Sequence, residues 1–268
     1  MGAREAAKSS READGASKVV PISSLYAADL ASALWASLVV SPFITIVDRS
    51  IIQNASGTKR MGDSVRAGFK ELFLRPHVFL RRPEFFMIWG VYASTYTAAN
   101  AVVTSCERRQ VDNRLPKFIG TSVVNIATCI SKDREFTRMF GATKPKSVPV
   151  PLYLLFMVRD GITIGASFNM PTPMSKYLQE RAGLSDKTAD IVSQLACPAG
   201  IQFFSTPLHL LGLDLYNKPK NSAYARGKFL ASAYIPSVAM RICRIGPAFG
   251  IGGVGNTAFR KYFRSLAE

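Results

Sequence analysis

The feature that most limits how this chain can fold is a set of three long stretches without a charged side chain. Residues 30–47, 85–106 and 191–213 contain no Asp, Glu, Lys or Arg. Each stretch has about the 17 to 25 residues that an α-helix needs to cross a bilayer. A large soluble helical protein is the alternative, but its buried helices usually keep a polar stripe and its uncharged runs are shorter. The pattern therefore predicts an all-α, multi-pass membrane protein.

Six segments have the character expected of transmembrane helices. They lie at 24–53, 83–108, 117–131, 149–178, 188–214 and 237–264. The third is the weakest candidate, because its uncharged part is short and a charged run follows it directly. Residues 1–23 are predicted to form a flexible tail, since they mix both charge signs and have no apolar core.

Charged residues lie mainly between these segments and give the chain a net charge of +16. The connection after the first segment is basic and contains an amphipathic stretch at 62–75, which predicts a helix on the membrane surface. The connections after the third and fifth segments are also basic, the former with Lys144 and Lys146. One membrane face is therefore predicted to be the positive side, with both termini on the other face. Nucleic-acid binding is disfavoured, because the basic residues do not follow one helix face.

The composition gives no indication of a metal site, a cofactor or an enzyme. The four cysteines are far apart in the sequence, with no CxxC pair, and the chain has only 2 histidines. Neither a zinc site nor a disulfide framework is indicated by that pattern. A phosphate-binding loop and a nucleophile paired with histidine are also missing from the sequence.

Related motifs recur along the chain and suggest an internal repeat. Ser41-Pro42 and Thr206-Pro207 lie in the first and fifth segments, and Arg159 and Arg244 are each followed by small residues in the fourth and sixth. The spacing of both pairs fits a repeat of roughly 83 residues. We therefore predict a membrane domain at 24–264 made of three tandem two-helix repeats, at about 24–110, 115–183 and 186–264.

On these residues the chain resembles the mitochondrial carrier family. Residues 236–247 and the basic end at 259–263 are similar to the family's sixth helix, and the stretch from Ser41-Pro42 through Arg49 to Gln53 resembles the end of its first. Arg159-Asp160 resembles an arginine–acid pair on the fourth helix of some carriers. The resemblance covers residues 24–264 and implies a carrier-like bundle of six helices in the mitochondrial inner membrane.

The chain departs from that family at the motifs that close its two gates. The positions expected to hold an acid and a base are Ile44 and Val47 after Pro42, His209 and Gly212 after Pro207, and Asn256 and Phe259 in the sixth segment. Alternating access needs two closures of comparable stability. The departures therefore leave open whether the chain transports a solute.

Charged residues in the middle of a span are the candidate substrate site. Each costs at least about 2.5 to 3.5 kcal/mol on insertion scales, which makes a function the default hypothesis. Arg159, Asp160, Arg241 and Arg244 are such residues, and the resemblance implies that Arg159 and Arg244 contact substrate in a central cavity. Arginine suits a carboxylate or phosphate, because its planar donors pair with two oxygens at once. The alternative is a buried structural cluster in which Asp160 and the helix ends neutralise the arginines.

The resemblance also implies helix kinks and a lipid site. Pro42 and Pro207 would kink the first and fifth segments, because proline removes a backbone hydrogen bond. Residues 224–227, with Arg226 and Gly227, resemble the family's cardiolipin-binding turn, and a weaker counterpart has Arg66 and Gly68. Membrane lipids, cardiolipin among them, are therefore predicted partners.

Two functions remain open at this point. The first is transport of a small anionic metabolite with non-standard gating, favoured because unpaired buried arginines need a reason to persist. The alternative is a carrier-fold protein that no longer transports and serves as a structural or accessory subunit of a mitochondrial inner-membrane complex, favoured by the missing gate charges.

Overall fold

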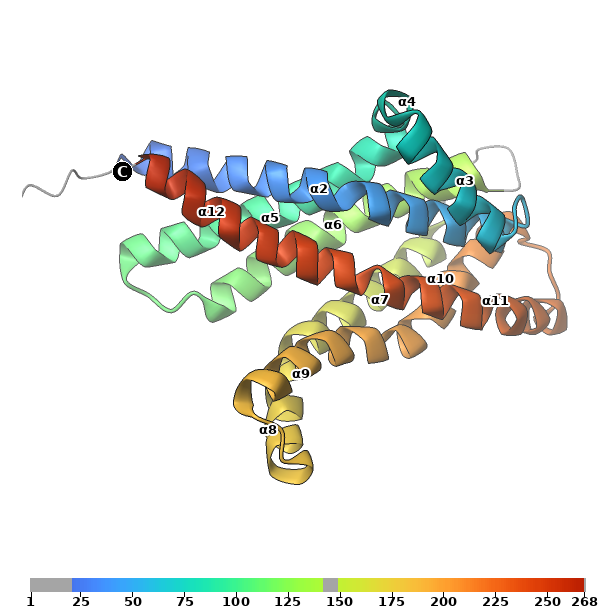
Figure 1. Ribbon diagram of the computed structural model, residues 1–268. Coiled ribbons are helices and arrows are strands. Elements are labelled where there is room, and N and C mark those ends of the chain that lie inside the picture. Colours follow the sequence, from blue (N-terminus) through green and yellow to red (C-terminus); the bar gives the residue numbers. More distant parts are fainter. Residues whose placement is uncertain (1–20, 142–148, 268) are drawn as a thin grey trace, which may run out of the picture.

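The computed structural model describes residues 21–141 and 149–267, and these residues fold into helices with no β-strand among them. Figure 1 shows one elongated bundle along which the chain runs back and forth. The all-α prediction is therefore confirmed. Most of the predicted tail (1–20) lies outside the described residues, as do Lys144 and Lys146 of the third connection.

The helices in chain order are α2 (Ile22–Ser56), α3 (Met61–Leu74), α4 (Pro76–Leu80), α5 (Pro83–Arg109), α6 (Arg114–Phe140), α7 (Val150–Asn169), α8 (Pro171–Ala182), α9 (Asp186–Gly200), α10 (Gln202–Asn217), α11 (Ala223–Cys243), the π-helical segment η1 (Gly246–Gly253) and α12 (Val254–Ala267). The first two predicted segments correspond to α2 and α5, and the helix predicted at 62–75 is α3. The third, α6, continues well beyond residue 131, and Lys132, Asp133, Phe136 and Thr137 of its charged half are buried in the bundle.

The last three predicted segments are each interrupted. A new helix begins at Pro171, whose ring disfavours a continuous helix. The fifth segment is divided at Ile201 into α9 and α10, and the sixth passes through η1. The sixth also begins earlier than expected, at Ala223, where the Ser222 hydroxyl accepts a hydrogen bond from the Ala225 amide at 3.2 Å and caps the helix.

Two helices of the described part of the chain are long and apolar enough to cross a membrane by length and composition: α2 and the Val150–Ser167 part of α7. The others are shorter or more polar; α9 and α10 have 15 and 16 residues. Six transmembrane helices in three carrier-like repeats are therefore not confirmed. The repeat boundaries stay a prediction.

The main apolar core lies where α2, α6, α7 and α10 meet, towards the end of the bundle that contains α3. Its largest buried side chains include Phe136, Phe156 and Tyr216. A Cβ atom on Gly212 of α10 would lie 2.5 Å from Leu152 Cδ1, so glycine is what allows α7 to pass this close. This tightly packed part is called the closed end below.

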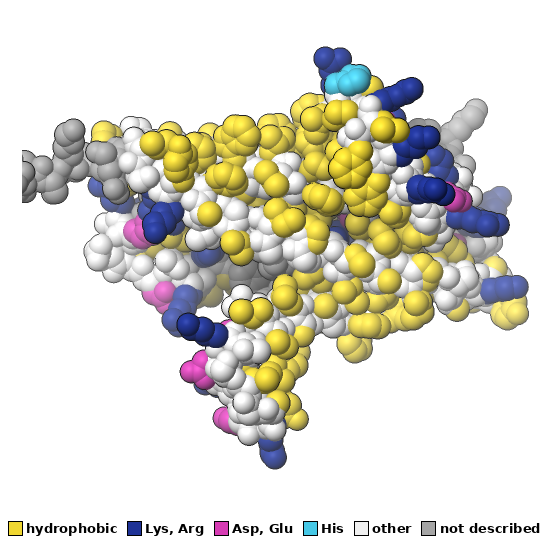
Figure 2. All heavy atoms as spheres, in the orientation of Figure 1, with side chains coloured by type: hydrophobic (Ala, Val, Ile, Leu, Met, Phe, Trp, Pro, Cys, Tyr) yellow, Lys and Arg dark blue, Asp and Glu magenta, His cyan; other side chains and the backbone are white. Residues whose placement is uncertain are grey.

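The helices separate at the opposite end, towards the start of α2 and the end of α12. The main contacts of α8 and α9 are with each other and with α7, α10 and α11. Figure 1 shows α8 and α9 leaning away from α5, α6 and α12, and Figure 2 shows a recess in the surface between these two groups. We call this part of the bundle the open end.

Candidate functional site

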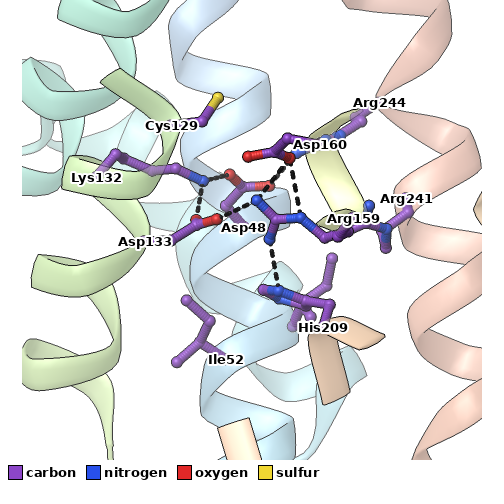
Figure 3. Close-up of a pocket in the computed structure, with 11 residues that line it drawn as sticks. Asp48, Ile52, Cys129, Lys132, Asp133, Arg159, Asp160, His209, Arg241 and Arg244 are labelled. Carbon is purple, nitrogen blue, oxygen red and sulfur yellow. Dashed lines mark hydrogen bonds and ion pairs between the residues drawn. The ribbon is translucent and has the colours of Figure 1, made fainter. Parts of the chain in front are cut away.

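Eight charged or titratable side chains meet inside the bundle, and they are called the charged cluster here. They come from five helices and one helix end: Asp48 of α2, Lys132 and Asp133 of α6, Arg159 and Asp160 of α7, His209 of α10, Arg241 of α11, and Arg244 directly after α11. Figure 3 shows them pointing towards one another. They line a cavity of about 30 Å³, which has room for about two water molecules.

Asp48 connects three helical segments through its two carboxylate oxygens. Its Oδ1 lies 2.9 Å from Arg244 Nη1, and its Oδ2 lies 2.7 Å from Lys132 Nζ. The same ammonium lies 2.5 Å from Asp133 Oδ1. Burial of a charge costs several kcal/mol unless an opposite charge accompanies it, so each of these groups needs its partner from the neighbouring segment.

Arg159 continues this alternation of charge. Its Nη2 lies 2.6 Å from Asp133 Oδ2 and 2.7 Å from Asp160 Oδ1, and its Nη1 lies 2.8 Å from His209 Nδ1. The guanidinium also lies 4.9 Å from the centre of the Phe156 ring, a favourable cation–π arrangement. Asp160 uses only Oδ1 in these contacts, and its buried Oδ2 has no hydrogen-bond partner among the described residues.

Arg241 differs from the other cations of the charged cluster, because its partners are neutral. Its Nε donates to Gln202 Oε1 at 2.8 Å and its Nη2 donates to Ser205 Oγ at 3.3 Å. The side chain is buried, yet none of the ion pairs in the described part of the chain includes it. The other three cations are matched by three carboxylates, so Arg241 is the unmatched positive charge of the charged cluster.

The four residues predicted to bind substrate are brought together in the charged cluster, which leaves their role as a prediction. The sequence pattern did not identify Asp48, Lys132, Asp133 or His209 as members of this site. A signal was available: Lys132 and Asp133 follow Cys129 of the uncharged run by three and four positions, the spacing of one helix face. Inter-helix ion pairs thus form here from residues other than those at the carrier gate positions.

The two predicted kink residues lie inside helices. Pro42 is within α2, and Pro207 is within α10. Pro42 precedes Asp48 by less than two helical turns, and Pro207 lies two positions before His209, so both prolines are near residues of the charged cluster in the sequence. The kinks themselves stay a prediction.

Two of the four residues predicted to bind lipid are occupied in other ways. Arg226 Nη1 lies 3.4 Å from Asp214 Oδ2, and its Nη2 donates to the carbonyl of Asn221 at 3.2 Å, so this arginine closes the turn before α11. Gly68 is buried against Ile46, where an added Cβ would meet two side-chain atoms at 2.9 Å. Arg66 and Gly227 are exposed. A role in lipid binding stays a prediction.

An all-helical bundle with a mixed-charge site buried beside an open end has the architecture of a membrane transport protein for a small polar solute. The particular family follows from a sequence comparison. The chain belongs to the family described as "probable citrulline exporter", whose model matches residues 32–264. No curated protein and no solved structure matches the chain. Family membership makes this chain a membrane transport protein and not an enzyme.

The family match corrects the assignment to the mitochondrial carrier family, which is wrong. That resemblance rested on a proline inside a helix, an arginine before small residues and a basic helix end. Any polytopic transporter with a buried arginine can have these features, whereas the gate motifs specific to carriers were missing. The inner-membrane placement in mitochondria, cardiolipin as a partner and the accessory-subunit alternative depended on the resemblance, and the match supports none of them.

Proposed function

We propose that this protein exports citrulline, or a closely similar amino acid with an uncharged side chain, and binds it at the charged cluster. The observation on which the proposal depends is Arg241, a buried cation whose hydrogen-bond partners are neutral. A buried guanidinium of this kind is costly unless it serves to bind an anionic group. The family description supplies the candidate substrate.

The charged groups of citrulline match two groups of the charged cluster that are available to a ligand, the Arg241 guanidinium and Oδ2 of Asp160. At neutral pH the molecule has a carboxylate, an ammonium and an uncharged ureido group. The carboxylate would pair with Arg241, because a planar guanidinium can donate two parallel hydrogen bonds to it. The ammonium would bind the free Oδ2 of Asp160. Gln202 and Ser205, displaced from Arg241, would then be available to the ureido group.

The presence of three carboxylates favours a zwitterion over the anionic metabolite expected from the sequence. Asp48, Asp133 and Asp160 lie in the same small cavity as the cations. A substrate with only negative charge would be attracted by Arg241 but repelled by these groups at short range. An amino acid places one charge of each sign where the opposite charge is available.

Substrate binding requires the site to expand, because a cavity of about 30 Å³ is much smaller than an amino acid. Movement of α10 and α11 away from α7 would enlarge it. The segment after Arg244 is suited to such movement, since η1 is π-helical and its sequence is GPAFGIGG. Single π-helical turns in longer helices are frequently found at functional sites. The substrate would favour the expanded form by the contacts that it makes only there.

The test is efflux of radiolabelled citrulline from liposomes that contain the purified protein. We expect Arg241→Gln to reduce the rate at least tenfold, because truncating one partner of a buried charge pair costs about 2 to 5 kcal/mol. The same variant should not lower the unfolding temperature, because it removes an unmatched buried charge. If Arg241 had only a structural role, Arg241→Gln would lower the unfolding temperature and leave the efflux rate unchanged.

A matched control is Arg66→Gln, which removes an exposed arginine of α3 and should leave efflux unchanged. Glutamate and inorganic phosphate serve as anionic competitors and should inhibit citrulline efflux weakly. The proposal fails if wild-type liposomes release citrulline no faster than protein-free liposomes, or if Arg241→Gln transports it at the wild-type rate.

A further inference from the structure

We propose a second binding site for the same amino acid in the polar pocket between α8 and α9, called the outer pocket here. The proposal rests on the proposed function for the identity of the ligand. The outer pocket has a volume of about 370 Å³, within the usual range for small-molecule sites. Its lining residues are Pro171, Thr172, Ser175, Lys176 and Gln179 of α8 with Asp190 and Gln194 of α9.

A fixed hydrogen-bond network orders the floor of the outer pocket. Ser175 is buried, and its hydroxyl donates to Asp190 Oδ1 at 2.6 Å while it accepts from Gln179 Nε2 at 3.1 Å. The network links the two helices and determines where the Asp190 carboxylate lies. Asp190 itself is exposed to the pocket, and its Oδ2 has no partner in the described part of the chain.

The charges of the outer pocket are complementary to an amino acid. Lys176 is exposed and forms no ion pair with any described residue, Asp190 included. The two opposite charges are therefore separated, and each is available to one end of a zwitterion. The amide of Gln194 and the free donor of Gln179 can bond to the ureido group, which both donates and accepts hydrogen bonds.

The outer pocket lies on a helix face that leads to the charged cluster. Gln194 and Ser205 are about three helical turns apart, and three turns return a side chain to the same face. Ile201, the only residue between α9 and α10, keeps helical dihedral angles, so the face continues across the junction. Ser205 is a partner of Arg241. Since α8 and α9 lie at the open end (Figure 1), the substrate would meet the outer pocket before the charged cluster.

This arrangement predicts an apparent affinity for substrate that depends on the outer pocket on one membrane face only. Because Lys176 and Asp190 are exposed, their pairs with substrate are screened by water and the outer pocket should bind weakly. It would raise the occupancy of substrate at the open end without taking part in passage through the closed end. Loss of the outer pocket should therefore weaken apparent affinity on one membrane face only.

The test measures citrulline transport from each membrane face separately in proteoliposomes of known orientation. We expect Lys176→Gln and Asp190→Asn each to raise the KM about threefold on the face where the termini lie. The KM on the opposite face should stay unchanged, and the maximal rate towards the termini face should fall in proportion, because the ratio of maximal rate to KM must remain equal in the two directions. Lys187→Gln is the matched control, because Lys187 is an exposed lysine of α9 that does not line the outer pocket. An equal change of the KM on both faces, or no change of the KM on either face, would contradict the second site.

Equilibrium binding separates this inference from the proposed function. In phospholipid-free detergent, Arg241→Gln protein should keep one weak site for citrulline, and adding Lys176→Gln should abolish it. If the Arg241→Gln protein binds no citrulline, the outer pocket is not a site, whatever the wild type transports. If phosphoethanolamine displaces citrulline at far lower concentration than citrulline itself binds, the outer pocket is a lipid headgroup site and the inference is wrong.

Discussion

Asp48 shows how much of this architecture depends on single buried charges. Its carboxylate contacts the ammonium of Lys132 and the guanidinium of Arg244, which come from different parts of the bundle. The side chain is 6% exposed, so bulk water solvates the carboxylate little. Removing the carboxylate charge would leave two cations near each other with only Asp133 to compensate Lys132.

We expect Asp48→Asn to lower the free energy of unfolding by about 3 to 5 kcal/mol, the usual cost of leaving a buried charge unpaired. Thermal unfolding of the purified protein in detergent measures this effect. Asp63→Asn, on the exposed first turn of α3, is the control and should change stability by about 1 kcal/mol or less. The double variant Asp48→Asn with Lys132→Met should recover part of the loss, and additive effects would show that the pair is not coupled.

The sequence predicted the arginines of the charged cluster but only part of their surroundings. Arg159, Arg241 and Arg244 are conspicuous because a charge inside an apolar helix is costly. Lys132 and Asp133 directly follow the uncharged run 118–131. A helix that ended at the membrane surface would have the same sequence pattern, so the pattern does not show that the two residues are buried. Whether they are buried depends on ion pairs with other helices, and these pairs are a tertiary property.

At the scale of helices, Gly212 shows why the gate charge expected from the carrier resemblance does not fit this fold. The resemblance placed a basic residue at this position, but here α7 crosses α10 so closely that a Cβ would lie 2.5 Å from Leu152 Cδ1 and 3.0 Å from Phe156 Cε1. Neither neighbour can move freely, because both side chains are buried in the main core. This position is one of close helix packing and has no room for a side chain.

We expect Gly212→Ala to destabilise the protein by about 1 to 3 kcal/mol, as overpacking of a well-filled core usually does. Gly90→Ala is the control, since nothing lies within 4 Å of a Cβ there and alanine favours the helix by up to about 1 kcal/mol. Chemical or thermal unfolding of the two variants in the same detergent compares them. Equal stability of both variants would contradict the close approach of α7 and α10.

The helix boundaries illustrate what a hydrophobic pattern can and cannot predict. The start of α5 at Pro83 was found because proline fits the first turn of a helix. The junction at Ile201 was not, since apolar residues continue through it. The π-helical segment η1 also has a contact far away in the sequence, which a local pattern does not contain: Tyr96 of α5 donates to the carbonyl of Ala248 at 3.0 Å.

Over the whole molecule, two groups of helices are held together differently. Near the open end α2, α5 and α12 are joined by polar contacts: Arg260 Nε lies 2.7 Å from Asp29 Oδ1, and the amides of Asn100 and Asn256 exchange hydrogen bonds of 3.0 and 2.9 Å. The other group, α7 to α10, meets them mainly at the charged cluster and the closed end. Motion of one group against the other is the kind of change that alternating access requires.

The bundle also predicts which parts of the chain face each side of a membrane. Both described chain ends and the α8–α9 turn lie at the open end, whereas α3 lies at the closed end (Figure 1). We expect a membrane-impermeant maleimide to label Gln194→Cys from the side of the termini and Lys70→Cys only from the opposite side. The background for both is a variant in which Cys106, Cys129, Cys197 and Cys243 are replaced by serine. Ala33→Cys, which is fully buried, should stay unlabelled from either side. Labelling of positions 194 and 70 from the same side would contradict this arrangement, because the charged cluster and the core between them leave no aqueous path from one end to the other.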